Sequence, residues 1–98
     1  MARLELAPEV LDDFDRFFDH WARYDVADDA AMRVGEIVEA LQILERSPLI
    51  GRKVGGGRRE LVIGRGARGY LALYRFVETI DTVFVLAIRS RRERGHRG

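Results

Sequence analysis

The feature that most constrains the fold is a change in hydrophobic period partway along the chain. Apolar residues recur every three or four positions through residues 8–46, then alternate or run together in short segments through residues 60–89. The first spacing is typical of amphipathic helices and the second of β-strands. We therefore expect an α+β fold in which the helical region covers one face of a sheet.

Residues 8–46 are predicted to form a helical hairpin. Pro8 suits the first turn of a helix, where its missing N–H has no partner to lose. The second helix should end near Pro48, because the residue before a proline avoids the α conformation. The other face of the first helix is polar and includes Asp12 and Asp13, and the row formed by Asp12, Asp15 and Asp19 is expected to be solvated. The apolar stripes of the two helices are Val10, Leu11, Phe14, Phe17, Phe18 and Trp21, then Val34, Ile37, Val38, Leu41 and Leu44.

The remaining segments predict strands, a loop and a tail. Alternating residues within 1–6 indicate a short N-terminal strand. Residues 60–89 contain three strand-like segments joined by short turns, which favours a three-stranded antiparallel meander. Residues 51–57, rich in glycine and positive charge, are expected to be a loop, and 90–98 a basic tail. The three segments are Glu60–Ile63, Tyr70–Val77 and Thr82–Ile88.

One glycine motif in the sequence resembles a nucleotide-binding motif but does not predict such a site. Gly64, Gly66 and Gly69 match the G-x-G-x-x-G pattern of dinucleotide sites. Such a site needs the motif between a strand and a helix of a βαβ unit, whereas here a strand follows. We expect a hairpin connection with glycines at positive φ instead.

Charge is divided unevenly along the sequence. Residues 1–48 carry five arginines and twelve carboxylates, a net −7, whereas residues 49–98 carry twelve basic and four acidic residues, a net +8. This asymmetry favours a basic functional surface in the second half, although the two halves could also face and neutralise each other.

Size and composition exclude several classes of protein. The 98 residues fit one domain, 1–98, and no cysteine is present for disulfides or thiolate chemistry. The longest apolar run, Val83–Ile88, is far too short to cross a bilayer, and the N-terminus lacks the apolar region of a signal peptide. We expect a soluble, cytoplasmic protein without membrane attachment.

Several stretches carry a resemblance to the RelE/ParE toxin superfamily. The opening Leu4–Glu9 precedes an amphipathic helix, and an apolar strand leads into Arg89 and then Arg92-Glu93 near the C-terminus. No single stretch is decisive, but the combination is specific and covers nearly the whole chain. The other matching stretches are Arg59–Leu61 and Gly69–Arg75. The resemblance implies a microbial-RNase-like α+β fold, neutralisation by a cognate antitoxin, and one of two targets: ribosome-bound mRNA for RelE-like members or DNA gyrase for ParE-like members.

The chemistry of the matching positions favours the ParE-like reading. RelE-like cleavage uses basic residues on the middle strands and tail, with a tyrosine near the C-terminus. The strand positions here are Val62, Gly64 and Leu71, which cannot transfer protons or stabilise charge. Arg91 and Arg92 match the tail, but no tyrosine follows. A nuclease would have to rely on Arg92, His96 and Arg75.

Binding is therefore the predicted mechanism, with no cofactor and no metal. An acidic amphipathic antitoxin segment would pair its carboxylates with arginines and insert apolar anchors between sheet and helices. Arg75 could instead pair with a helix carboxylate. The expected partner-binding residues are Arg58, Arg59, Arg65, Arg75, Arg89, Arg91 and Arg92. The alternatives are a ribosome-dependent mRNA endonuclease and a decayed, non-toxic fold that still binds antitoxin.

Overall fold

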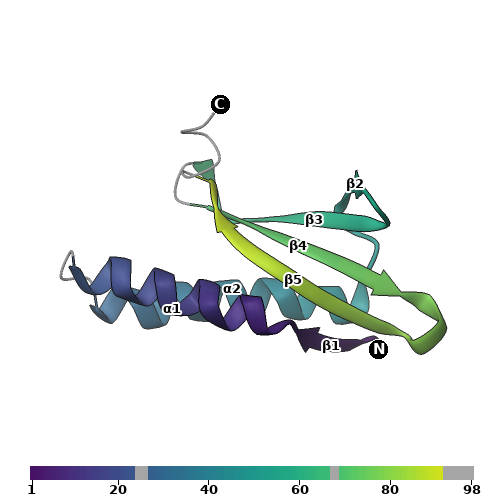
Figure 1. The fold of residues 1–98 in the computed structure, drawn as a ribbon, viewed down its shortest axis with the longest axis horizontal. Helices are drawn as coiled ribbons and strands as arrows, with labels where there is room; N and C mark the ends of the chain where they lie inside the picture. Colours follow the sequence, from purple (N-terminus) through teal and green to yellow (C-terminus); the bar gives the residue numbers. More distant parts are fainter. Residues whose placement is uncertain (24–26, 67–68, 92–98) are drawn as a thin grey trace.

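A computed structural model describes residues 1–23, 27–66 and 69–91 (Figure 1). These residues form two helices and a five-stranded sheet, so the predicted α+β class is confirmed. None of the described helices combines the length and apolarity that a membrane crossing requires. The elements are β1 (Arg3–Leu6), α1 (Pro8–Arg23), α2 (Ala27–Arg46), β2 (Arg52–Gly55), β3 (Arg58–Ile63), β4 (Tyr70–Val77), the short 3-10 helix η2 (Glu78–Ile80) and β5 (Thr82–Ser90).

The helical bounds follow the sequence signals. Helix α1 begins at Pro8, and α2 ends at Arg46, two residues before Pro48. The N–H of Ala2 donates to the carbonyl of Glu45 at 2.8 Å, which ties the N-terminus to the end of α2. The helical hairpin predicted for residues 8–46 is thus confirmed in both of its helices, while the connection at residues 24–26 lies outside the described part.

The sheet has the order β1-β5-β4-β3-β2 (Figure 1). Strand β1 is parallel to β5, and every other neighbouring pair is antiparallel. The predicted meander is present as β3, β4 and β5. The predicted loop at residues 51–57 is wrong in part, because Arg52–Gly55 forms β2 at the edge of the sheet. Its pairing with β3 places Arg52 opposite Glu60, and the two side chains form an ion pair at 2.7 Å.

The core lies between the helices and one face of the sheet. Alternate residues of β4 point into it, and Tyr74 and Ala72 are fully buried. Ile37, Leu41 and Leu44 of α2 are also fully or almost fully buried in the same cluster. The other strand members of this cluster are Ile63, Tyr70, Val83, Val85 and Ile88. These side chains form the core of the protein, and the entry of apolar antitoxin side chains between sheet and helices stays a prediction.

A bulge in β5 keeps its buried residues on one face. Leu73 lies opposite Ala87, but the next residue, Tyr74, lies opposite Val85, so β5 has one residue more than β4 at this point. The buried positions consequently change from Val83 and Val85 to Ile88. The extra residue shifts the alternation of β5 by one position, so the side chain of Ile88 points into the core as those of Val83 and Val85 do.

Tyr74 fastens the connection between α2 and β2 to the sheet. Its hydroxyl donates to the Pro48 carbonyl and accepts from the Gly51 N–H, both at 2.8 Å. Arg59, opposite Tyr74 on β3, donates to the carbonyls of Leu49 at 3.0 Å and Gly51 at 2.8 Å. Burial raises the pKa of Tyr74, partly offset by the Gly51 hydrogen bond and the Arg59 charge. The hydroxyl therefore stays protonated at neutral pH and remains able to donate.

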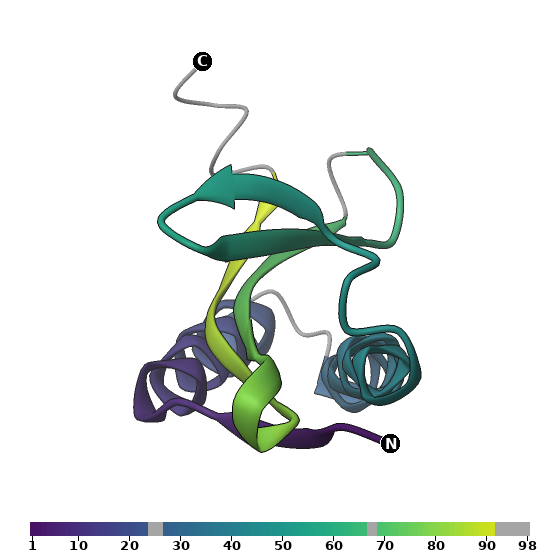
Figure 2. The ribbon, with the colours of Figure 1, turned by 90° about the vertical axis from the view of Figure 1, so that its right-hand side faces the viewer.

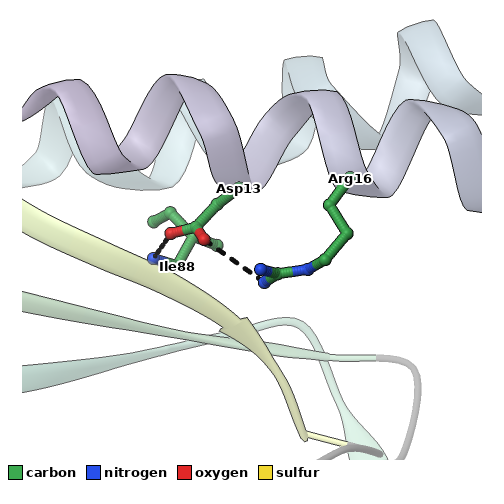
Figure 3. Close-up of polar contacts among 3 residues, drawn as sticks. All are labelled: Asp13, Arg16 and Ile88. Carbon is green, nitrogen blue, oxygen red and sulfur yellow. Dashed lines mark hydrogen bonds and ion pairs between the residues drawn. The ribbon is translucent and has the colours of Figure 1, made fainter.

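Asp13 joins α1 to the free edge of β5 (Figure 3). Strand β1 ends at Leu6, opposite Val85, so it cannot pair with the end of β5. There the Ile88 N–H donates to Asp13 Oδ2 at 2.9 Å, and Arg16 approaches Asp13 Oδ1 at 3.2 Å. Although Asp13 belongs to the polar face of α1, its side chain is only 13% exposed because it turns toward β5.

Replacing Asp13 with alanine should lower the free energy of unfolding by about 1–3 kcal/mol relative to Asp12→Ala. Both substitutions remove a carboxylate from α1 and add the same helix propensity, but only Asp13 accepts the Ile88 N–H. Urea denaturation of the two variants measures the difference. Equal stabilities would contradict a role for Asp13 in closing the strand edge.

Candidate partner-binding surface

The sheet has a second face, opposite the core, which we call the outer sheet face. Residues paired across antiparallel strands share a face, so the register identifies its members from their buried neighbours. Within the described residues, none of them belongs to the core cluster shared with the helices. They are Arg58, Glu60 and Val62 of β3, Leu71, Leu73, Arg75 and Val77 of β4, and Phe84, Ala87 and Arg89 of β5.

Apolar side chains occupy the middle of the outer sheet face, and arginines lie toward both ends. Leu71 has Val62 on one side and Arg89 on the other, while Arg75 lies opposite Phe84. Val62 is 54% exposed and Leu71 only 8%, and Phe84 is half-buried. Arg75 and Arg89 are both exposed. Such a surface suits a partner that brings apolar side chains flanked by carboxylates.

The positions that the superfamily resemblance assigns to catalysis lie within this apolar region. Val62 and Leu71 are direct neighbours across β3 and β4. Gly64 lies in the following turn with φ of 76°, and Gly66 has φ of 57°, which confirms a glycine turn at the G-x-G-x-x-G motif. None of these residues can donate or accept a proton, so this row supplies binding area and no acid–base chemistry.

The predicted arginines do not form one cluster. Arg58 and Arg75 meet at the β2–β3 turn, where Arg58 Nε donates to the Gly55 carbonyl at 3.3 Å and Arg75 Nη2 to the Gly56 carbonyl at 2.6 Å. Arg75 thus bonds to a backbone carbonyl of this turn rather than to a helix carboxylate. Arg59 is directed inward to the α2–β2 connection, so its guanidinium has a structural role.

Three further arginines lie near the end of β5. The Arg91 N–H donates to the Gly69 carbonyl at 3.0 Å, and the aliphatic part of its side chain packs beside Gly69. Arg65 is exposed in the neighbouring turn, and Arg89 extends from the outer sheet face. Arg92 and His96 lie outside the described residues, so the candidate nuclease set is represented by Arg75 alone.

Tyr70, at the start of β4, contacts both helices. Tyr70 is buried, with its ring centroid 5.4 Å from that of Phe17 on α1. Arg33 Nη1 donates to its hydroxyl at 3.4 Å, which links α2 to the same ring. Tyr70 therefore joins both helices to the sheet, and its buried ring is not free to stack on a nucleobase. In the described segments, no group of three potential metal-binding side chains occurs.

Solved structures of toxin–antitoxin proteins share this fold. The chain superposes on the "Chromosomal ParDE TA system from P. aeruginosa" with a TM-score of 0.77 and 24% identity, covering 92% of this chain and 96% of that one. The intact E. coli RelBE toxin–antitoxin complex gives a TM-score of 0.55 at 16% identity, with 92% and 96% covered. A metal-bound toxin from Helicobacter pylori gives 0.54 at 11% identity, with 95% and 98% covered. The fold is therefore that of toxins from type II toxin–antitoxin systems.

Comparison of the sequence with protein families narrows the assignment from a shared fold to one family. The family model described as "ParE toxin of type II toxin-antitoxin system, parDE" matches residues 4–95. The chain belongs to this ParE toxin family. No curated protein matches it by sequence. The predicted superfamily is confirmed, and the protein is the toxin component of a type II toxin–antitoxin system.

Proposed function

We propose that this toxin acts by binding and inhibiting DNA gyrase, and that its antitoxin neutralises it by covering the outer sheet face. The observation that supports binding over catalysis is the apolar row formed by Val62 and Leu71. A ribonuclease of the RelE type would carry basic residues at these two positions, which here are apolar. Membership of the ParE family supports gyrase as the target.

The antitoxin side of the proposal follows from the chemistry of the outer sheet face. An amphipathic segment would bury apolar side chains against Leu73, Val62 and Phe84 and place carboxylates beside Arg75 and Arg89. Arg91 extends the cationic rim past the end of β5. The related structures described as ParDE and RelBE systems support an antitoxin as the resting partner.

A reconstituted assay tests the target directly. Purified gyrase, relaxed plasmid and ATP are combined with the free toxin, and supercoiling is followed on gels. We expect the toxin to inhibit supercoiling and toxin premixed with antitoxin to leave it unchanged. The same preparation is added to ribosomes translating a defined mRNA. Cleavage of that mRNA, together with normal supercoiling, would contradict the gyrase proposal and favour the endonuclease alternative.

A further inference from the structure

The β2–β3 hairpin concentrates exposed positive charge. From Arg46 to Val77 the sequence contains eight basic residues and one carboxylate, Glu60. Glu60 is paired with Arg52 at 2.7 Å, although the Arg52 side chain remains 70% exposed. We call the hairpin together with Arg75, which reaches it from β4, the basic hairpin. Its exposed cations are Arg52, Lys53, Arg58 and Arg75.

The tip of the basic hairpin carries no side chain. Gly55, Gly56 and Gly57 have φ values of 94°, 63° and 72°, a run of conformations that L side chains rarely adopt. Arg58 Nε and Arg75 Nη2 donate to two of the tip carbonyls, so both guanidinium groups are held at the tip. Each bond uses one of five guanidinium N–H donors, which leaves the others available to an anion.

The acidic residues lie elsewhere in the molecule. Helices α1 and α2 contain ten carboxylates and four arginines. Figures 1 and 2 both show β2 and β3 on the side of the molecule away from the two helices. A polyanion is therefore attracted to the basic hairpin and repelled from the helical side, which favours one orientation of approach.

We propose that the basic hairpin binds the phosphodiester backbone of a nucleic acid without reading its bases. Arginine, lysine and closely approached backbone are the groups that proteins use on phosphates. The centre of a protein–protein interface is rich in aromatic residues as well as arginine and is depleted of lysine, so the lysine and the lack of aromatic residues favour a phosphate ligand here. The tip offers only glycines and cations, with no apolar anchor. DNA and RNA share the ligand chemistry, and the experiment below distinguishes them.

This site differs from the outer sheet face in Lys53, which is paired with the inward-directed Arg59, whereas Arg58 and Arg75 are shared by both. Lys53 and Arg58 belong to β2 and β3 at the hairpin and have exposed side chains. Nucleic-acid binding, antitoxin binding and gyrase inhibition are measured in separate assays, so failure of this proposal is distinguishable from failure of the proposed function.

The test uses the free full-length chain, released from its antitoxin and refolded, with circular dichroism to verify folding. Fluorescence anisotropy follows binding to a labelled 20-base-pair DNA duplex and to a 20-nucleotide RNA over a salt series. The test variant is Lys53→Ala with Arg58→Ala. The matched control is Arg3→Ala with Arg46→Ala, which removes the same charge from exposed positions outside the hairpin.

We expect the test variant to bind duplex DNA about tenfold or more weakly at 50 mM salt. The slope of log affinity against log salt should fall by about 2, because each phosphate contact contributes roughly 0.9. The control should lose less than threefold. If the test variant loses binding and the control does not, the proposal is supported. The nucleic acid whose binding is lost then identifies the ligand as DNA or RNA. Absence of binding at 50 mM salt, or equal losses in both variants, would overturn the proposal.

Discussion

Replacing Gly51 with alanine should destabilise the protein by about 3–5 kcal/mol. A Cβ at this position would lie 2.6 Å from the Tyr74 hydroxyl oxygen, 2.7 Å from its Cε1 and 2.9 Å from the Glu60 carbonyl oxygen. Tyr74 is fully buried, so its ring cannot swing into solvent to make room. Moving it would break both of its hydrogen bonds, leaving the buried Gly51 N–H and the part-buried Pro48 carbonyl without this partner.

Gly35→Ala is the matched control for this substitution. A Cβ at Gly35 has nothing within 4 Å, and the residue lies inside α2, where alanine is the better helix former by about 1 kcal/mol. In urea denaturation, Gly51→Ala should therefore lower the free energy of unfolding and Gly35→Ala should raise it. A Gly51→Ala variant within about 1 kcal/mol of the wild type would contradict the packing of Tyr74 against this connection.

Reversing charge at Arg89 and Arg91 should weaken antitoxin binding at least a hundredfold, about 3 kcal/mol. Arg89 is exposed beside Leu71 on the outer sheet face, and Arg91 follows the end of β5. Glutamates at both positions would place negative charge against the carboxylates of an acidic antitoxin segment. Each substituted position loses an attraction to the antitoxin and gains a repulsion. The loss of affinity is therefore larger than for substitution by alanine.

Isothermal titration calorimetry with the purified antitoxin measures this loss. The control is Arg3→Glu with Arg46→Glu, which changes the net charge equally at exposed positions on β1 and α2. We expect the control to bind within about fivefold of the wild type. Thermal melting of each free variant separates a lost contact from a lost fold. Unchanged affinity in the Arg89 and Arg91 variant would place the antitoxin elsewhere on the toxin.

The parts of the fold that the sequence predicted depend on local signals. Pro8 and Pro48 limit where the two helices begin and end. Most described members of the predicted apolar stripes pack in the core, whereas Leu11 and Val38 are exposed. Strand β2 has no such signal, because Arg52–Gly55 contains one apolar residue and a glycine. It becomes a strand only through pairing with β3, where tertiary context overrides local preference.

The site was predictable in type of residue but not in arrangement. The continuous apolar run of β5 hides its bulge, so the face of Arg89 could not be read from alternation. Asp13 accepts the Ile88 N–H only because β1 stops at Leu6, a boundary set by three-dimensional pairing. Arg59 did leave a signal: it alternates with Leu61 and Ile63, which places it on the inner face of β3.

The most direct test of the central claim is induction of this chain in cells without its antitoxin, with pulse labels for DNA and protein synthesis over the first minutes. The account predicts that DNA synthesis falls first, accompanied by an SOS response. An initial fall in protein synthesis would contradict it and favour cleavage of ribosome-bound mRNA. Continued growth with both syntheses unchanged would also contradict it, and would mark this chain as a toxin fold that has lost its toxicity.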